Sequence, residues 1–78
     1  MKNVLVIGST GQIGSELTMK LRNMIPDGNI VAGYIPGAEP KGILLESGPA
    51  EEANVKNAQQ LADVVEKYKI DTIYNLAA

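Results

Sequence analysis

The stretch Gly8-Ser9-Thr10-Gly11-Gln12-Ile13-Gly14 directly follows the apolar run Val4-Leu5-Val6-Ile7 and leads into an amphipathic segment. Its spacing, G-x-x-G-x-x-G, is typical of a turn between a buried strand and a helix. Glycine permits backbone angles closed to other residues, and it lets a diphosphate approach where a side chain would collide. The following helix offers unpaired N–H groups and the positive end of its dipole. The stretch therefore predicts a dinucleotide-binding turn, and the alternative is a tight turn that serves packing alone.

Apolar patterning predicts the elements next to this turn. The unbroken apolar character of residues 3–7 indicates a strand buried on both faces of a parallel sheet. Residues 12–24 have the period of an amphipathic helix. We expect its buried stripe to contain Ile13, Leu17, Leu21 and Met24 or Ile25, and its outer face to contain Glu16, Lys20 and Arg22.

The rest of the sequence predicts, in chain order, two more strands, a second helix and a final strand. We expect strands at residues 29–34, 43–45 and 71–76, and a helix at about 57–68 whose inner face holds Leu61, Val64, Val65 and Tyr68. Two prolines and two glycines make residues 35–42 a loop, and Ser47-Gly48-Pro49 ends the third strand. Right-handed crossovers then favour an α/β fold, a partial doubly wound parallel sheet with strand order 3-2-1-4 and helices on its faces.

A ligand of such a sheet binds beyond the carboxyl ends of the strands, where the winding reverses. In this chain that crevice lies between Gly8 and Ala77. Ala77 and Ala78 are small, which suits either the close approach of a flat ring or ordinary tight packing.

Composition excludes several classes of function. The 78 residues suffice for one small domain, and seven Lys plus Arg against nine Asp plus Glu give a net charge of -2 without a basic block. We therefore expect no nucleic-acid partner. Without cysteine or histidine there are no disulfides, imidazole catalysis or common zinc sites. No segment is long and apolar enough for a signal peptide or a membrane span, so we expect a cytoplasmic, soluble chain.

Three short segments of the chain resemble one family. GSTGQIGSEL at residues 8–17, SGP at 47–49 and NLAA at 75–78 resemble the extended short-chain dehydrogenase/reductase family, also called the NAD-dependent epimerase/dehydratase family. Within it, the chain resembles short-chain L-threonine 3-dehydrogenases. The resemblance implies a Rossmann-like fold with NAD as cofactor, and it identifies residues 1–78 as the N-terminal portion of the dinucleotide-binding domain.

The resemblance also implies roles for individual residues. Gly8, Gly11 and Gly14 shape the turn, the N–H groups of Gln12 and Ile13 hold the diphosphate, and Leu76, Ala77 and Ala78 line the stretch from adenosine to nicotinamide. Tyr34 stands where the family usually has an acidic residue for the adenosine ribose. It either stacks on adenine or packs at the strand end. Lys41 is the only nearby cation, so NADP is not excluded.

Asn54 matches an aspartate that commonly contacts adenine in this family. An amide keeps one such hydrogen bond, although Asn54 is also a candidate helix cap in competition with Asn57. The neighbouring pair Glu51-Glu52 is interpreted as a solvated face.

The catalytic centre implied by the resemblance is absent from these residues. The family uses a Tyr-x-x-x-Lys pair, in which tyrosine is the general acid/base. Here Tyr34, Tyr68 and Tyr74 are followed four positions later by Ala38, Thr72 and Ala78. We therefore expect an NAD(P)-binding segment of a threonine-dehydrogenase/epimerase-like oxidoreductase that is inactive alone. The alternatives are a stand-alone nucleotide-binding module, or a structural piece that completes another chain's sheet through the exposed edge of the fourth strand, with a second copy as a further candidate partner.

Overall fold

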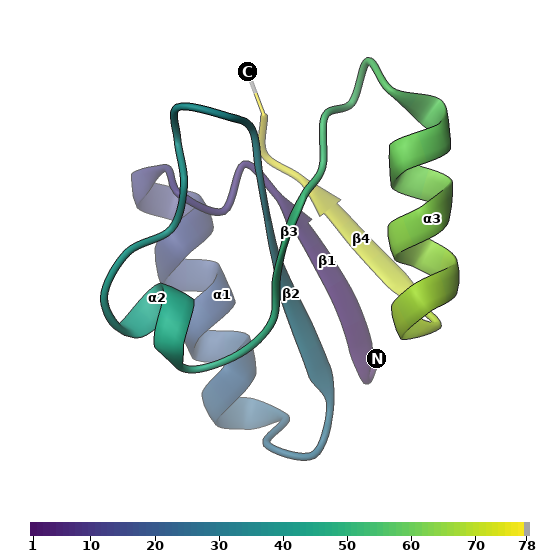
Figure 1. Ribbon diagram of the computed structural model, residues 1–78. Helices are drawn as coiled ribbons and strands as arrows, with labels where there is room; N and C mark the ends of the chain where they lie inside the picture. The colour runs from purple at the N-terminus through teal and green to yellow at the C-terminus, as the bar shows by residue number, and fades with distance from the viewer. Residues whose placement is uncertain (78) are drawn as a thin grey trace.

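The computed structural model describes residues 1–77 of the chain, arranged as a parallel sheet between helices (Figure 1). In chain order the elements are β1 (Asn3–Ile7), α1 (Gln12–Met24), β2 (Asn29–Tyr34), α2 (Ile43–Glu46), β3 (Ala50–Glu52), α3 (Ala58–Tyr68) and β4 (Thr72–Asn75). The predicted bounds of β1, α1 and β2 are confirmed, and α3 agrees with its prediction to within one residue.

The strands form one parallel sheet in the order β3-β2-β1-β4, as the crossover rule predicts. Leu5 of β1 stands opposite Val31 of β2 on one side and Ile73 of β4 on the other. All four strands therefore point their carboxyl ends to one edge, the upper edge in Figure 1, where the loops after β1 and β2 and the end of the chain gather. The expected partial doubly wound fold is confirmed.

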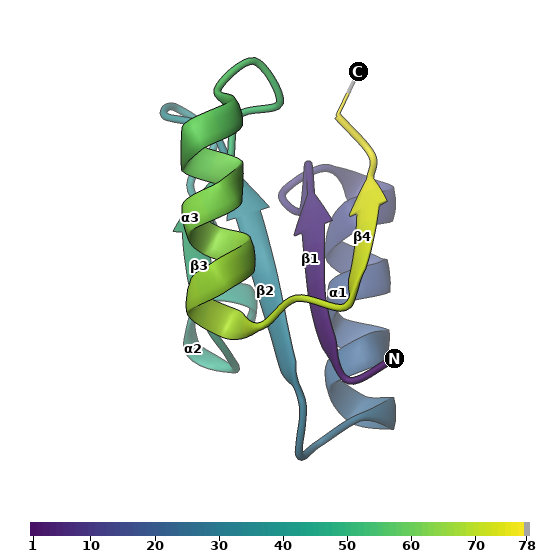
Figure 2. The ribbon, with the colours of Figure 1, turned by 90° about the vertical axis from the view of Figure 1, so that its right-hand side faces the viewer.

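The core has two halves because side chains of β1 alternate between the faces of the sheet. Leu5 and Ile7 face α3, and Val4 and Val6 face α1. Figure 2 shows the strands side by side across the sheet, with α3 in front of the sheet and α1 behind it. The first half consists of Leu5, Ile7, Val31, Ala53 and Val64, with Leu61, Tyr68 and Ile70 against it. The second consists of Val4, Val6, Leu21 and Ile30, with Leu17, Ile25 and Tyr74 against it.

The buried face of α1 differs from the expected stripe at Ile13, which is 72% exposed. At the other end, where Met24 or Ile25 was expected to be buried, Ile25 packs against the core and Met24 is 63% exposed. A helix of 13 residues is about 20 Å long, whereas the five residues of β1 span about 16 Å, so the ends of α1 run past the strand. The residues of α1 that are fully buried are Gly14, Thr18 and Leu21. The hydroxyl of Thr18 is satisfied there by donating to the carbonyl oxygen of Gly14 at 2.7 Å.

The expected strand at residues 43–45 is wrong, because these residues form the short helix α2. Only Leu44 of its apolar residues is buried, at 8% exposure, while Ile43 and Leu45 are 65% and 51% exposed. A run of three apolar residues is too short for its period to distinguish a helix from a strand. The third strand comes later, directly after Pro49, and its residue Ala50 stands opposite Ala32 of β2.

Arg22 points inward, contrary to the expected outward orientation. Its guanidinium donates to the carbonyl oxygens of Ile30 at 2.9 Å and Pro49 at 2.8 Å. It also donates to the carbonyl oxygen of Leu44 at 2.6 Å and to the hydroxyl of Ser47 at 3.0 Å. Burial lowers the pKa of Arg22. The side chain thus joins α1 to β2 and to the segment that contains α2 and the start of β3.

Polar side chains make contacts at both ends of α3. The Asn57 side chain caps α3 by accepting from the N–H of Gln60 at 3.0 Å. Glu51 differs from the expectation that the pair Glu51-Glu52 forms a solvated face. Its carboxylate accepts from the Tyr68 hydroxyl at 2.6 Å and from Lys67 at 2.8 Å. Hydrogen bonds from Lys67 and Tyr68 lower the pKa of Glu51.

The expected fourth strand, residues 71–76, is shorter in the structure because its first and last residues lie outside β4. Asp71 instead joins the start of β4 to the start of the chain. Its Oδ2 atom accepts from the N–H groups of Lys2 and Asn3 at 3.0 and 2.9 Å. Leu76 continues the ladder beyond the strand, since its N–H donates to the carbonyl oxygen of Ile7 at 2.9 Å.

We predict that Arg22→Met destabilises the fold by about 2 kcal/mol, because it leaves carbonyl groups of β2, α2 and Pro49 without their shared charged donor. Methionine keeps the apolar stem, so the loss reports on the guanidinium. Urea unfolding measures it. Lys20→Met is the matched control, because Lys20 is exposed on the same helix. Equal unfolding free energies for the two variants would contradict the role given to Arg22.

We predict that the free energy of unfolding falls as the pH is lowered from 3.8 toward 2. The reason is that hydrogen bonds from Asn3, Thr72 and Lys2 lower the pKa of Asp71 from 3.8 to about 2. A lowered folded-state pKa stabilises the fold above pH 3.8, and that contribution is lost as the pH falls toward 2. Melting temperatures at pH values across this window measure it. Asp71→Asn should flatten the dependence, and Asp63→Asn on the exposed face of α3 is the control. An unchanged slope in Asp71→Asn would refute the assignment.

Candidate functional site

The turn between β1 and α1 is fixed to the end of β2. Gly8 has φ +79°, a left-handed angle that other residues rarely adopt. Ser9 is fully buried, and both its N–H and its hydroxyl donate to the carbonyl oxygen of Gly33, at 3.1 and 2.8 Å. The N–H of Gly11 closes the turn by donating to the carbonyl oxygen of Gly8 at 3.3 Å. The backbone of the turn is therefore held in place before any ligand arrives.

The glycines of this turn have different surroundings. A Cβ atom added to Gly14 would overlap the carbonyl oxygen of Gly8, because α1 and the turn touch there through their backbones. A Cβ atom on Gly8 would lie 2.9 Å from the backbone nitrogen of Ala77. At Gly11 the nearest atom would be 3.6 Å away, which is an ordinary contact. Gly8 and Gly14 are thus required by packing, whereas the space above Gly11 is open.

This open space lies at the N-terminus of α1. Gly11 is the N-cap residue and provides no side-chain hydrogen bond, and the first turn of α1 contains no acidic residue. The first N–H groups of a helix have no partner within the helix. They lie beside a cavity of about 370 Å³ lined by Gly8, Gly11, Gln12, Ile13, Gly14 and Leu76. The positive end of the α1 dipole and these donors make this first cavity suitable for an anion.

A second cavity, of about 350 Å³, continues from the first toward the end of β2 and shares Gly8, Gly11 and Leu76 with it. Most of its lining is apolar. The lining residues are Ile7, Gly8, Thr10, Gly11, Tyr34, Ile35, Ala38, Ala53, Leu76 and Ala77. This cavity brings Tyr34 together with Leu76 and Ala77, and it lies at the switch point between β1 and β4. A flat, largely apolar group fits it.

A third cavity, of about 490 Å³, lies between the turn and the loop that follows β2. It shares Thr10 and Ala38 with the second cavity. Its remaining lining residues are Ser15, Gly37, Glu39, Pro40, Lys41 and Leu44. Charged side chains therefore line the site on this side, whereas the second cavity contains none.

Two of the predicted site residues lie apart from these cavities or outside the described residues. Asn54 is not among the residues that line them, and its Oδ1 atom accepts from the N–H of Lys56 at 2.9 Å. Asn57 caps α3 in its place. Ala78 lies outside residues 1–77, which the structure describes.

Sequence reasoning missed several lining residues, among them Thr10, Ile35, Ala38 and Ala53. Thr10 lies within the glycine turn, so its place in the motif could have identified it. Ala53 follows β3, and its N–H donates to the carbonyl oxygen of Tyr34 at 2.7 Å. Because the third strand was expected at residues 43–45, no pattern placed Ala53 beside the end of β2.

Within residues 1–77, no group of three or more histidine, cysteine, aspartate or glutamate side chains is placed to hold a metal ion. No helix in the described part of the chain is long and apolar enough to cross a membrane. The chemistry that the site itself offers is anion binding by backbone donors beside a partly apolar cleft.

Comparison with known proteins gives a family and several relatives. The NAD dependent epimerase/dehydratase family matches residues 4–78. An uncharacterized epimerase/dehydratase of Staphylococcus saprophyticus is 36% identical over 78 residues, which make up 100% of this chain and 24% of that protein. The chain thus spans about a quarter of the length of the curated relatives that it matches.

Solved structures of similar fold include two L-threonine dehydrogenases. The enzyme from Clostridium difficile has a TM-score of 0.86 at 39% identity, over 100% of this chain and 24% of that one. The holo form of the enzyme from Cupriavidus necator has a TM-score of 0.80 at 33% identity, again over 100% and 24%.

Proposed function

The chain belongs to the NAD-dependent epimerase/dehydratase family, and on this premise we propose that residues 1–78 form the N-terminal portion of a dinucleotide-binding domain that binds NAD. The observation that carries the proposal is the open space above Gly11, beside the uncapped N-terminus of α1. Side chains at Gly8 and Gly14 would collide with backbone, but a side chain at Gly11 would meet only the ligand. Such a cradle fits a diphosphate.

The proposed roles follow the order of the cavities. The N–H groups of Gln12 and Ile13 bind the diphosphate in the first cavity. Tyr34 contacts the adenine in the second cavity, and Leu76, Ala77 and Ala78 line the path from adenosine toward nicotinamide. Asn54 directly follows Ala53, a lining residue of the second cavity, and its Oδ1 atom is engaged with Lys56. Its Nδ2 group is therefore the proposed donor to adenine.

The reaction proposed for the whole protein is that of a threonine-dehydrogenase-like oxidoreductase, in which NAD accepts a hydride from the carbinol carbon of an L-threonine-like substrate. The likeness to L-threonine dehydrogenases at 39% and 33% identity supports this substrate class. Residues 1–78 contain no Tyr-x-x-x-Lys pair, so we propose that they contribute cofactor binding and no proton transfer.

An interaction role is the second candidate, because β4 is an edge strand of the sheet. Ile73 and Leu76 on and beside this strand are 49% and 40% exposed. An exposed edge with apolar side chains favours pairing with a further strand. We propose that, for residues 1–78 taken by themselves, a second copy of the chain pairs at that edge.

We predict that Gly11→Val abolishes NAD binding without unfolding the chain, whereas Gly14→Val also costs about 2 kcal/mol of stability. The φ and ψ of Gly11 are −72° and 169°, extended angles that valine adopts readily, but the added side chain occupies the proposed diphosphate space. At Gly14 the added atoms meet the backbone of Gly8. Amide chemical shifts during NAD titration and urea unfolding measure the two properties.

The wild-type titration is the reference for this pair of variants. Saturating NAD should move the amide signals of Gly11, Gln12 and Ile13. If neither NAD nor NADP moves them, the proposed function fails. Equal effects of both valine variants on binding and on stability would contradict the separate roles of the two glycines.

We predict that the melting temperature of the chain rises with its concentration, because pairing at the β4 edge stabilises the folded state by mass action. Ile73→Lys should weaken the dependence, since a charge on an edge strand opposes pairing. Sedimentation and melting over about a hundredfold dilution test this. A compact monomer with a constant melting temperature would refute the interaction role and leave the NAD-binding role intact.

A further inference from the structure

We propose that Glu39, in the loop after β2, holds the adenosine ribose of NAD through its 2′ and 3′ hydroxyl groups and so selects NAD over NADP. The inference rests on the proposed NAD binding and adds to it the residue that determines cofactor choice. It follows from two observations: Glu39 lines the third cavity, and β2 ends with Tyr34 instead of a carboxylate.

The end of β2 lacks the group that ribose recognition requires. Dinucleotide-binding domains of this fold place an Asp or Glu about 20 residues beyond the glycine turn, where it accepts from the ribose. Here β2 ends with Tyr34. A phenol hydroxyl offers one donor and acts as a single acceptor atom, whereas a carboxylate offers two oxygens to two hydroxyl groups. A carboxylate from another position must therefore take this role if the ribose is bound in the same way.

Glu39 occupies a suitable place. It lines the third cavity together with Thr10, which belongs to the glycine turn, and Lys41. Because Thr10 and Ala38 line both the second and the third cavity, the two lie next to each other. A ribose attached to a diphosphate at the turn lies next to this junction. Its hydroxyl groups then face the third cavity while the adenine enters the second.

A hydrogen bond within the loop orients the carboxylate of Glu39. The N–H of Gly37 donates to Oε2 of Glu39 at 3.0 Å, and Gly37 has φ +92°, an angle suited to glycine. The N–H of Ala38 donates to the carbonyl oxygen of Ile35 at 3.0 Å, which closes the preceding turn. Pro40 is buried, which anchors the loop beside Glu39. A carboxylate accepts about four hydrogen bonds, so the bond from Gly37 leaves capacity for two hydroxyl groups.

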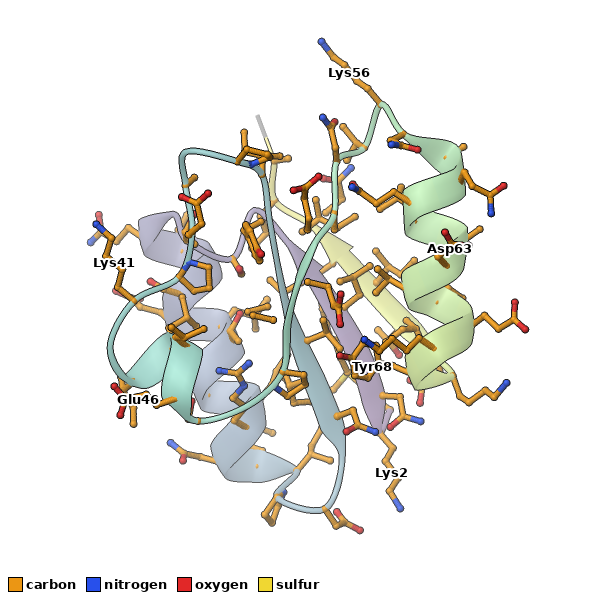
Figure 3. All side chains as sticks on the ribbon, viewed as in Figure 1. Lys2, Lys41, Glu46, Lys56, Asp63 and Tyr68 are labelled. Carbon is orange, nitrogen blue, oxygen red and sulfur yellow. The ribbon has the colours of Figure 1, made fainter. Side chains whose placement is uncertain are left out.

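The carboxylate of Glu39 favours a hydroxyl over a phosphate at the 2′ position. Hydrogen bonds from the backbone of Gly37 and of Glu39 itself, with the nearby charge of Lys41, lower the pKa of Glu39, so the carboxylate is ionised at neutral pH. An ionised carboxylate accepts from a 2′-hydroxyl and repels a 2′-phosphate. Lys41 would instead attract that phosphate, and Figure 3 shows it on the same loop, near the start of α1. The two side chains therefore make opposite predictions, and the hydrogen bond from Gly37 that orients the carboxylate favours Glu39.

The test compares the binding of two ligands to three proteins, and this comparison isolates the contact between Glu39 and the 2′-hydroxyl. AMP and 2′-deoxy-AMP are titrated into the wild-type chain, Glu39→Gln and Glu46→Gln, with amide chemical shifts as the readout. Glutamine keeps the size of the side chain and its acceptor for the N–H of Gly37. Glu46 lies on α2, away from the lining of the three cavities, so its variant controls for the change in net charge (Figure 3).

We expect the wild-type chain and Glu46→Gln to bind AMP about tenfold more tightly than 2′-deoxy-AMP, and Glu39→Gln to bind the two alike. NAD should also bind more tightly than NADP, and Glu39→Gln should remove that preference. If AMP and NAD bind but Glu39→Gln retains the full preference for AMP over 2′-deoxy-AMP, the assignment of Glu39 is overturned and NAD binding stands. Tighter binding of NADP, lost in Lys41→Met, would also overturn it. Absence of any binding would overturn both proposals.

Discussion

The close approach of two backbones, where α1 packs on the turn after β1, is the constraint on which the site depends. At Gly14 the helix touches the carbonyl group of Gly8, and only glycine permits that distance. The same turn approaches the backbone of Ala77 from its other side, so Gly8 is enclosed by two elements. Ser9 then ties the turn to β2. Helix, turn and strand ends are thereby held together, which fixes the first N–H groups of α1 at the edge where a ligand of this sheet binds.

A second constraint is the side chain of Arg22, near the C-terminal end of α1, whose guanidinium donates hydrogen bonds to several segments of the chain. Arg22 reaches carbonyl groups of β2, α2 and the residue before β3, so it connects three segments that are separate in the sequence. An added Cβ atom at Gly48 would collide with this guanidinium, which explains why a glycine precedes Pro49. The SGP segment therefore has a packing role: it lets the backbone before β3 approach the guanidinium of Arg22. Since the loop that contains Glu39 leads into α2, the position of the third cavity also depends on this contact.

The sequence predicted the elements that have a clear period and failed where the signal was short or tertiary. β1, α1 and β2 were predicted with their bounds, because an unbroken apolar run and a glycine turn constrain them strongly. The third strand was misplaced, because Ile43-Leu44-Leu45 looks equally apolar in a strand or a helix, and β3 itself contains two glutamates. The inward direction of Arg22 was not predictable from its own helix, since the carbonyl groups that attract it lie far along the chain. The glycine motif indicated the turn beside the first cavity, but the charged lining of the third cavity depends on the path of the loop after β2.

In the proposed site, binding of the diphosphate and selection between NAD and NADP depend on different parts of the chain. The proposed diphosphate contacts use backbone N–H groups, so they depend on the glycines and on the packing of α1 rather than on particular side chains. The proposed discrimination between NAD and NADP, in contrast, depends on one charged side chain in a loop where Pro40 is buried and Ala38 is half-buried. A substitution in that loop costs little folding energy, because exposed loop positions have few contacts to lose. Cofactor preference can therefore change in this fold without disturbing the turn, and a tyrosine at the end of β2 is compatible with NAD binding as long as a carboxylate reaches the ribose from the neighbouring loop.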